Sequence, residues 1–268
     1  MQAYVLHRYD WSESSLILDL FTRERGRVSV AAKGAKRPYS QLRAVLLPFQ
    51  RIHVTLGRSP ADEHAEIHNL RHAEWAGGLP MLGGAALFSG FYLNELLMKL
   101  LARHDPHPTL FDAYADTLPA LGSGNELLNQ AALRAFELLL LRETGVLPDL
   151  ALVTLTVQPV LEQGFYQIVP ESGVVATREE SGAFTGAALS ALQKALDGGG
   201  TSALQAACAP CTGPLRSALR ALLHYHLGSP ALRTRQVAQG VQRLMDTVAP
   251  RAPLFADPPN PHEPARRS

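Results

Sequence analysis

The hydrophobic pattern of this chain changes its period near residue 75, and this change constrains the fold more than any other feature. Before it, apolar and polar residues alternate in short runs, as in 16–21 and 51–56. A period of two with one apolar face is typical of antiparallel strands packed on a core. After it, apolar residues recur at helical spacing, first along 85–103. The pattern therefore predicts an α+β chain with a β part followed by a mainly helical part.

The first 76 residues contain five alternating runs, which lie around 4–7, 16–21, 27–32, 51–56 and 67–70. Five short strands fit a small closed or partly closed barrel, and the OB-fold is the commonest such unit. The pattern alone does not separate an OB-fold from an SH3-like barrel. We interpret Tyr4, Phe21 and Phe49 as barrel core, and 1–76 as an OB-fold domain.

The second part, 77–248, is predicted to be a helical domain. Three helices are expected over 85–103, 109–121 and 126–144, with Asn125 as an N-cap of the third. Residues 149–184 lose the helical pattern, and we read them as an irregular β insertion with strands at 153–157, 164–169 and 173–175. Helical patterns return at 186–196, 202–208, 214–227 and 235–248. The Pro-rich residues 249–268 have too little apolar surface to offset ordering entropy, so we predict a disordered tail.

Positive charge is concentrated in one part of this nearly neutral chain. Between Phe21 and Arg58, nine Lys/Arg residues stand against one acid, Glu24, whereas 16 basic and 23 acidic residues occupy the rest. A concentrated basic surface attracts polyanions, and phosphate neutralisation supplies most non-specific affinity for nucleic acid. Two interpretations stand side by side: a nucleic-acid surface, and a solvated sheet face whose cations spread over both edges.

Motifs of catalysis are missing from the sequence. It contains no Gly-x-x-x-x-Gly-Lys-Ser/Thr loop, no Gly-x-Gly-x-x-Gly fingerprint, no Gly-x-Ser-x-Gly elbow and no His-Glu-x-x-His pair. Cys208 and Cys211 have half of a zinc-site spacing, but His224 and His226 are two residues apart and would point to different faces of a helix. We therefore expect no enzyme activity, no cofactor and no metal, and two thiols at a helix–helix turn.

The location of the chain is predicted from its cysteines and its apolar runs. The two cysteines suit a reducing compartment, and no run of eighteen apolar residues is long enough to span a membrane. We expect a cytoplasmic protein that has no contact with a membrane.

Aromatic residues are interspersed with the cations of the first 43 residues. OB-folds hold single strands by stacking bases on aromatic rings beside cationic contacts to the backbone. Trp11 and Tyr39 stand in polar, turn-like contexts, so we expect them to be exposed. We interpret 34–40 as a mobile basic loop, the alternative being a merely solvated loop. The predicted DNA-binding residues are Arg8, Arg23, Arg25, Arg27, Lys33, Lys36, Arg37, Tyr39 and Arg43.

Several segments carry a family resemblance, among them Ala3-Tyr4-Val5-Leu6-His7, 11–22, Gly26-Arg27-Val28, 32–36, Leu46-Leu47-Pro48-Phe49, 89–97, Leu133-Arg134-Ala135-Phe136-Glu137 and Leu232-Arg233-Thr234-Arg235. Through them the chain resembles the RecO family of bacterial DNA repair and recombination proteins over roughly residues 3–245. The resemblance implies an N-terminal OB-fold, a helical domain and a non-enzymatic role. It also implies association with the nucleoid.

The resemblance further implies partners. Members of the family bind single- and double-stranded DNA, anneal complementary strands, and with RecR help to load recombinase onto strands coated by single-stranded DNA-binding protein. Their helical domain receives the acidic C-terminal tail of that protein, and Arg134 is the candidate here for pairing with its carboxylates. The alternative for Arg134 is a surface residue bridged to Glu137 or Gln130. A second hypothesis for the whole chain is an adaptor that binds acidic proteins and contacts DNA only indirectly.

The resemblance also concerns a metal. Many members of the family carry a four-cysteine zinc site in the β insertion after the third helix. Residues 150–176 contain no cysteine here. The chain departs from the zinc-bearing pattern, which is a second reason to expect no metal.

Overall fold

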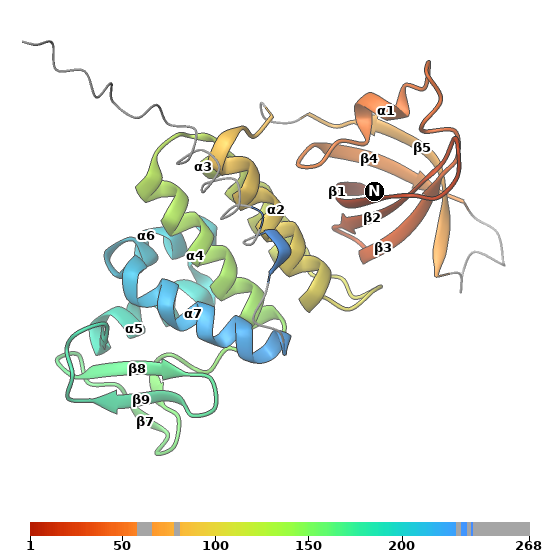
Figure 1. Ribbon diagram of the computed structural model, residues 1–268. Helices are drawn as coiled ribbons and strands as arrows, with labels where there is room; N and C mark the ends of the chain where they lie inside the picture. Colours follow the sequence, from red (N-terminus) through yellow and green to blue (C-terminus); the bar gives the residue numbers. More distant parts are fainter. Residues whose placement is uncertain (58–65, 78–80, 229–231, 235–236, 238–268) are drawn as a thin grey trace, which may run out of the picture.

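The computed structural model describes residues 1–57, 66–77, 81–228, 232–234 and 237. The tail predicted for 249–268 lies outside the described residues, and so does all but residue 237 of the helix predicted for 235–248. Figure 1 shows a barrel at one end of the molecule, a group of helices in the middle and a small sheet at the opposite end.

The N-terminal part is a closed five-stranded barrel with the strand order β1-β2-β3-β5-β4. Its strands are β1 (Gln2–Asp10), β2 (Leu16–Thr22), β3 (Gly26–Ala32), β4 (Arg51–Leu56) and β5 (Ile67–Trp75), with the short helix α1 (Leu42–Val45) between β3 and β4. All neighbouring pairs are antiparallel except β3 and β5. This arrangement confirms the predicted OB-fold.

The barrel has two buried surfaces. Small and branched side chains fill its interior, among them Val5, Leu20 and Val30. Tyr4 and Phe21 are buried as predicted, but they lie on the outside of the barrel and belong to the core of the helical part. They are cross-strand partners on the face opposite Val5 and Leu20, because alternate residues of a strand face opposite sides.

The outer face of the barrel and the helical part share one apolar core, which is separate from the barrel interior. The Tyr4 ring lies 4.9 Å from the Tyr114 ring, and the Phe21 ring lies 5.4 Å from that of Phe111. Phe49, also predicted for the barrel core, joins the same cluster and contacts Phe91 with ring centroids 5.0 Å apart. The assignment of these rings to the barrel interior was therefore wrong, because helices cover that outer face.

In the described part of the chain, six α-helices follow the barrel. They are α2 (Gly84–Leu100), α3 (Pro108–Gly122), α4 (Glu126–Glu143), α5 (Gly186–Lys194), α6 (Gly200–Cys208) and α7 (Thr212–Leu227), with the π-helical turn η2 (Ala195–Gly199) continuing α5 and the short η3 (Ala209–Cys211) before α7. Asn125 caps α4 as predicted, since its side chain accepts from the amides of Leu127 and Leu128.

A buried polar contact fixes the barrel against the helices. Asn94 of α2 is 3% exposed, and its Nδ2 donates to the carbonyl oxygen of Leu6 at 3.0 Å. The Tyr114 hydroxyl donates to Asn94 Oδ1 at 2.6 Å. The register of β1 against β2 shifts between Val5 and His7, which is the point where Asn94 reaches the strand. Satisfied buried networks of this kind specify one arrangement of the packed elements.

The β insertion forms two small sheets. Its strands are β6 (Leu152–Val153), β7 (Gln158–Pro159), β8 (Phe165–Val169), β9 (Gly173–Thr177) and β10 (Phe184–Thr185). β8 and β9 confirm two predicted strands. The strand predicted for 153–157 is wrong, because these residues turn back between β6 and β7. The Thr154 hydroxyl accepts from the Val174 amide at 2.8 Å, and this contact ties the turn to β9.

Candidate nucleic-acid interface

The end of the barrel away from the helices opens into a basic groove, which we call the mouth groove. It encloses about 410 Å³ and is lined by Arg8, Asp10, Leu16, Ala35, Lys36, Arg43 and Leu46. Arg8 faces inward beside Leu18 at the end of β1, because the bulge in β1 changes which residues point inward after Val5. Its Nη1 donates to the Leu46 carbonyl at 3.4 Å. Three predicted DNA-binding residues thus meet in one hollow.

Two loops form the rim of the mouth groove and are tied to each other. The backbone amide of Lys36 donates to the Ser14 carbonyl, and its Nζ donates to the Ser12 carbonyl, both at 3.0 Å. Ala35 is buried and anchors the 33–40 loop in the barrel. Gly34 takes a positive φ of 74°, which lets the chain turn as it leaves β3. The basic loop predicted from the sequence is therefore held at its base.

The outer rim carries further exposed side chains. Lys33, Arg37 and Arg43 are exposed, and within the described part of the chain none of them forms an ion pair. Tyr39 is 98% exposed and Trp11 is 55% exposed, which confirms the prediction for both rings. Lys36 pairs with Asp10 at 3.0 Å, so one acid is built into this basic groove.

The opposite end of the barrel uses its predicted arginines differently. Arg23 Nε and Nη2 donate to the two carboxylate oxygens of Asp112 in α3 at 3.0 and 2.9 Å. These hydrogen bonds raise the pKa of the Arg23 guanidinium. Arg27 is half-buried, and its Nη1 donates to the Met98 carbonyl of α2. Burial lowers the pKa of Arg27. Both residues therefore join the barrel to the helices, and we call this end the junction.

Arg25 lies at the junction but remains exposed. It belongs to the tight turn between β2 and β3, where Gly26 takes a φ of 63°. A Cβ at Gly26 would come within 1.8 Å of the Asp105 carbonyl oxygen. The backbone amide of His104 donates to the Arg27 carbonyl at 3.0 Å. The turn and the connection between α2 and α3 thus pack backbone against backbone.

A second groove lies between α2, α4 and α7, and we call it the helical groove. It encloses about 350 Å³, and its apolar lining includes Phe88, Leu133, Leu223 and Leu232. Arg134 lines it, but its side chain is only 13% exposed and pairs with the buried Glu137 at 2.9 Å. Tyr92 donates to the same carboxylate oxygen at 2.6 Å. The bridge to Glu137 that was weighed for Arg134 is present, whereas Gln130 bonds to Glu126.

Sequence reasoning missed the two exposed arginines of this groove. Arg216 and Arg220 of α7 line it together with His224. Among the described residues neither arginine forms an ion pair. The signal was the spacing of four residues between 216, 220 and 224, which puts all three side chains on one helix face.

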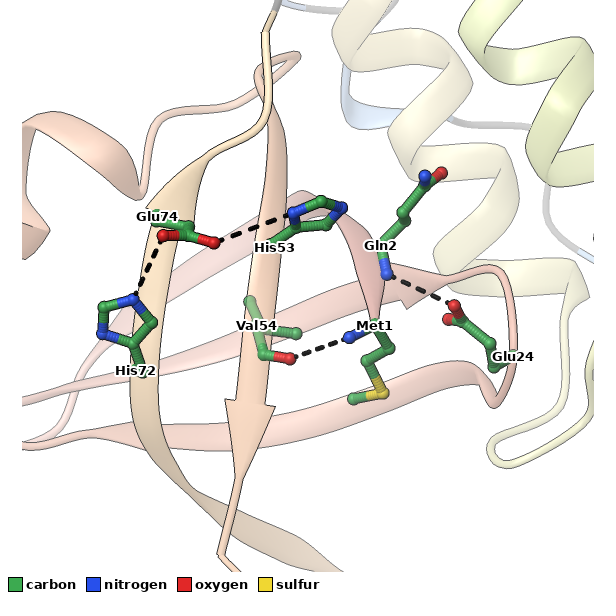
Figure 2. Close-up of polar contacts among 7 residues, drawn as sticks. All are labelled: Met1, Gln2, Glu24, His53, Val54, His72 and Glu74. Carbon is green, nitrogen blue, oxygen red and sulfur yellow. Dashed lines mark hydrogen bonds and ion pairs between the residues drawn. The ribbon is translucent and has the colours of Figure 1, made fainter.

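The outer side of β4 and β5 has a different chemistry (Figure 2). Glu74 lies between His53 Nδ1 at 3.8 Å and His72 Nε2 at 3.5 Å, and all three side chains are largely exposed. The Met1 ammonium donates to the Val54 carbonyl at 3.0 Å, which attaches the chain start to β4. Within the part of the chain that the structure describes, no cluster of His, Cys, Asp and Glu fits a metal ion.

The cysteines do not form a thiolate site. Cys208 and Cys211 are buried free thiols, and burial raises the pKa of Cys211 to about 11. A thiolate ligand would need a lowered pKa. In the insertion, the Tyr166 hydroxyl of β8 accepts from the Leu161 amide of the preceding loop at 2.8 Å. The residues present do not suit a four-cysteine zinc centre. Among the described residues, no helix is both long enough and apolar enough to cross a membrane.

Comparisons with known proteins agree with this architecture. The family model described as "Recombination protein O N terminal" matches residues 1–78, and that described as "Recombination protein O C terminal" matches residues 83–236. The DNA repair protein RecO of Polaromonas naphthalenivorans (strain CJ2) is 52% identical over 245 residues, which cover 90% of this chain and 96% of that protein. The DNA repair protein RecO of Verminephrobacter eiseniae (strain EF01-2) is 50% identical over 244 residues with the same coverage. The chain therefore belongs to the RecO family of DNA repair and recombination proteins.

Proposed function

We propose that this protein is a non-enzymatic recombination mediator that binds DNA through the mouth groove and its rim. The observation that carries the proposal is the convergence of Arg8, Lys36 and Arg43 on one hollow at the end of an OB-fold. Cations gathered in this way neutralise phosphates and release counterions, and they do so on single- and double-stranded DNA alike. The named role of the relatives in DNA repair supports the same conclusion.

Annealing follows from the same chemistry. A basic surface screens the repulsion between two backbones, and contacts confined to phosphates leave base edges free to pair. No hydrolysis is needed for this activity. Together with RecR, such a protein would pass strands from single-stranded DNA-binding protein to a recombinase in the nucleoid of the cytoplasm.

A second binding role concerns the helical groove. We propose that it receives the acidic C-terminal tail of single-stranded DNA-binding protein. Its apolar lining suits the side chains of a peptide, and Arg216 and Arg220 offer exposed guanidinium groups to carboxylates. Arg134 is paired with Glu137, so it would help to shape the base of this site and would offer less free charge to the peptide.

The DNA proposal is tested by reversing the charge of the rim. In the triple variant Lys33→Glu, Lys36→Glu and Arg37→Glu, we expect loss of oligonucleotide binding and a flatter dependence of affinity on salt, measured by fluorescence anisotropy. The matched control reverses three cations far from the barrel mouth: Arg142, Arg178 and Lys194. Circular dichroism verifies that both variants fold. Unchanged binding by the folded rim variant would refute the proposal.

The competing hypotheses give different results in the same assay. An adaptor that binds acidic proteins would leave the oligonucleotide free near physiological salt, even as the unaltered protein. An enzyme would release products from DNA incubated with magnesium, whereas a mediator returns the strands intact.

The peptide proposal has its own test. Arg216→Glu and Arg220→Glu should each weaken binding of a labelled acidic peptide at least tenfold, because charge-assisted hydrogen bonds contribute about 1.5–3 kcal/mol each. Arg178→Glu, an exposed arginine of the β insertion, is the control. Equal affinities of all three variants for the peptide would exclude the helical groove as its binding site.

A further inference from the structure

Aromatic rings continue from the mouth groove onto the outer face of β1. His7 and Tyr9 are exposed, and their ring centroids lie 4.4 Å apart in an edge-to-face contact. They are two residues apart, so they point to the same side of the strand. Trp11 is the next residue of this series, directly after β1, and its amide donates to the Ser15 carbonyl at 3.3 Å. Three exposed rings thus stand at alternate positions along about 13 Å of extended chain.

Cations lie at both ends of this row of rings. At the Trp11 end, Lys36 is tied to the Ser12 carbonyl. At the His7 end, Arg103 reaches the barrel from the connection between α2 and α3, and its Nη2 lies 3.9 Å from Asp19 Oδ1. The Arg103 side chain is 44% exposed, so part of it faces solvent.

Arg103 is held in this position by backbone contacts. It forms an isolated β-bridge with Arg27, and the next residue, His104, donates its amide to the Arg27 carbonyl. The Asp19 carboxylate beneath it is buried and also accepts from the Ser29 hydroxyl. Burial raises the pKa of Tyr9, Asp19 adds to this effect, and Arg103 opposes it, as expected of groups that lie close together.

We infer that a single strand of nucleic acid crosses the outer face of β1, with its bases stacked on Trp11, Tyr9 and His7 and its backbone drawn to Lys36 and Arg103. The inference rests on the proposed DNA binding and adds a strand preference to it. Aromatic rings accept the faces of unpaired bases, whereas a duplex has its base faces already stacked. The mouth groove binds phosphates of both single- and double-stranded nucleic acid, whereas the row of rings adds affinity for the single strand.

The two tryptophans of the chain, Trp11 and Trp75, permit a direct test. In Trp75→Phe, Trp11 is the single tryptophan, and we expect a saturable loss of its fluorescence with oligothymidylate but little change with a duplex of equal length. In Trp11→Phe, the remaining Trp75 reports on the far strand β5 and should not respond. Binding by anisotropy without any change at Trp11 would overturn the inference and leave the proposed function intact.

Affinity measurements provide the second arm. Tyr9→Ala should weaken binding of oligothymidylate about tenfold and binding of a duplex much less, since a stacked base is lost. Tyr225→Ala, an exposed tyrosine of α7, is the control. Arg103→Ala should reduce the salt dependence for the single strand by about 0.7 in log–log slope, as expected for one phosphate contact. Equal losses of affinity for single strand and duplex in Tyr9→Ala would contradict stacking. If the unaltered protein bound neither the single strand nor the duplex, the proposed function itself would be refuted.

Discussion

The two ends of the barrel carry the same type of residue with different consequences. At the mouth, Arg8, Lys36 and Arg43 line an open hollow. At the junction, Arg23 and Arg27 bind groups of the helical part. In the sequence, the cations of both ends of the barrel fall in one basic segment and cannot be told apart by counting. The neighbours that pack on each end decide which cations stay available to a ligand.

The comparison also separates stability from binding. Junction residues are tied to α2, α3 and the connection between them, so their substitution should act first on folding. Mouth residues contact mainly the loops of the barrel itself, so their substitution should act first on affinity.

The sharpest test compares two glycines with similar backbone angles. Gly26 at the junction has φ 63° and faces the Asp105 carbonyl, whereas Gly34 at the mouth has φ 74° and a Cβ there would lie 3.5 Å from the nearest side-chain atom. Gly26→Ala should cost about 3 kcal/mol or more of unfolding free energy, because overpacking adds to the cost of the left-handed conformation. Gly34→Ala should cost only about 1–2 kcal/mol. Chemical denaturation measures both, and equal costs would show that the junction is loosely packed.

The next effect concerns affinity. Arg8→Ala combined with Arg43→Ala should weaken oligonucleotide binding roughly tenfold and reduce the salt slope by about 1.4, with little loss of stability. Arg23→Ala should change the slope far less, because Asp112 already neutralises its charge. Anisotropy titrations over a series of salt concentrations measure these slopes. If Arg23→Ala reduced the slope as much as the mouth variant, the separation of the two ends would be wrong.

A smaller effect is expected at the acid of the mouth. Asp10 pairs with Lys36, and its carboxylate is 81% exposed. Asp10→Asn should raise the affinity for an oligonucleotide a few-fold, because it removes a negative charge that competes with phosphate for Lys36. Glu13→Gln, an exposed acid on the neighbouring loop, is the control for a non-specific change of charge. A loss of affinity in Asp10→Asn would show that Asp10 positions Lys36 for binding.

The smallest effect is a dependence of stability on pH at the junction. Burial, then the neighbouring His68, Arg103 and Arg25, lower the pKa of His104 below its usual 6.5. The unfolded chain therefore takes up a proton at His104 more readily than the folded chain does. The contribution of His104 to the free energy of unfolding is complete above pH 6.5 and is lost as the pH falls. His104→Asn should flatten the pH dependence of unfolding in that range, since Asn tolerates the positive φ of this position. An unchanged profile would show that His104 does not titrate as inferred.

The sequence predicted the barrel and the first three helices well because local signals determined them. Alternation identified the strands, and Asn125 marked the start of α4. The location of Tyr4 and Phe21 was not predictable in this way, since alternation shows that two faces exist but not which one faces the helices. The turn at 153–157 was missed because Thr154 bonds to Val174, twenty residues away.

The candidate site was predictable only in part, for the same reason. Residue type and density identified the basic segment, and polar context identified the exposed Trp11 and Tyr39. The division of the arginines between mouth and junction depends on Asp112 and Met98, which are distant in sequence. The pair Arg216 and Arg220 lies in a segment where no net charge stands out, and only the packing of α7 against α4 brings them to a groove that α2 also lines.

Amide hydrogen exchange of the whole protein with and without a single-stranded oligonucleotide tests the central claim most directly. Occupation of the mouth should slow exchange in the two rim loops, 11–15 and 33–40, and leave the turn between β2 and β3 unchanged at its tip. Unchanged exchange in both rim loops at saturating oligonucleotide, with protection elsewhere, would contradict the claim that phosphate binds at the mouth of the barrel.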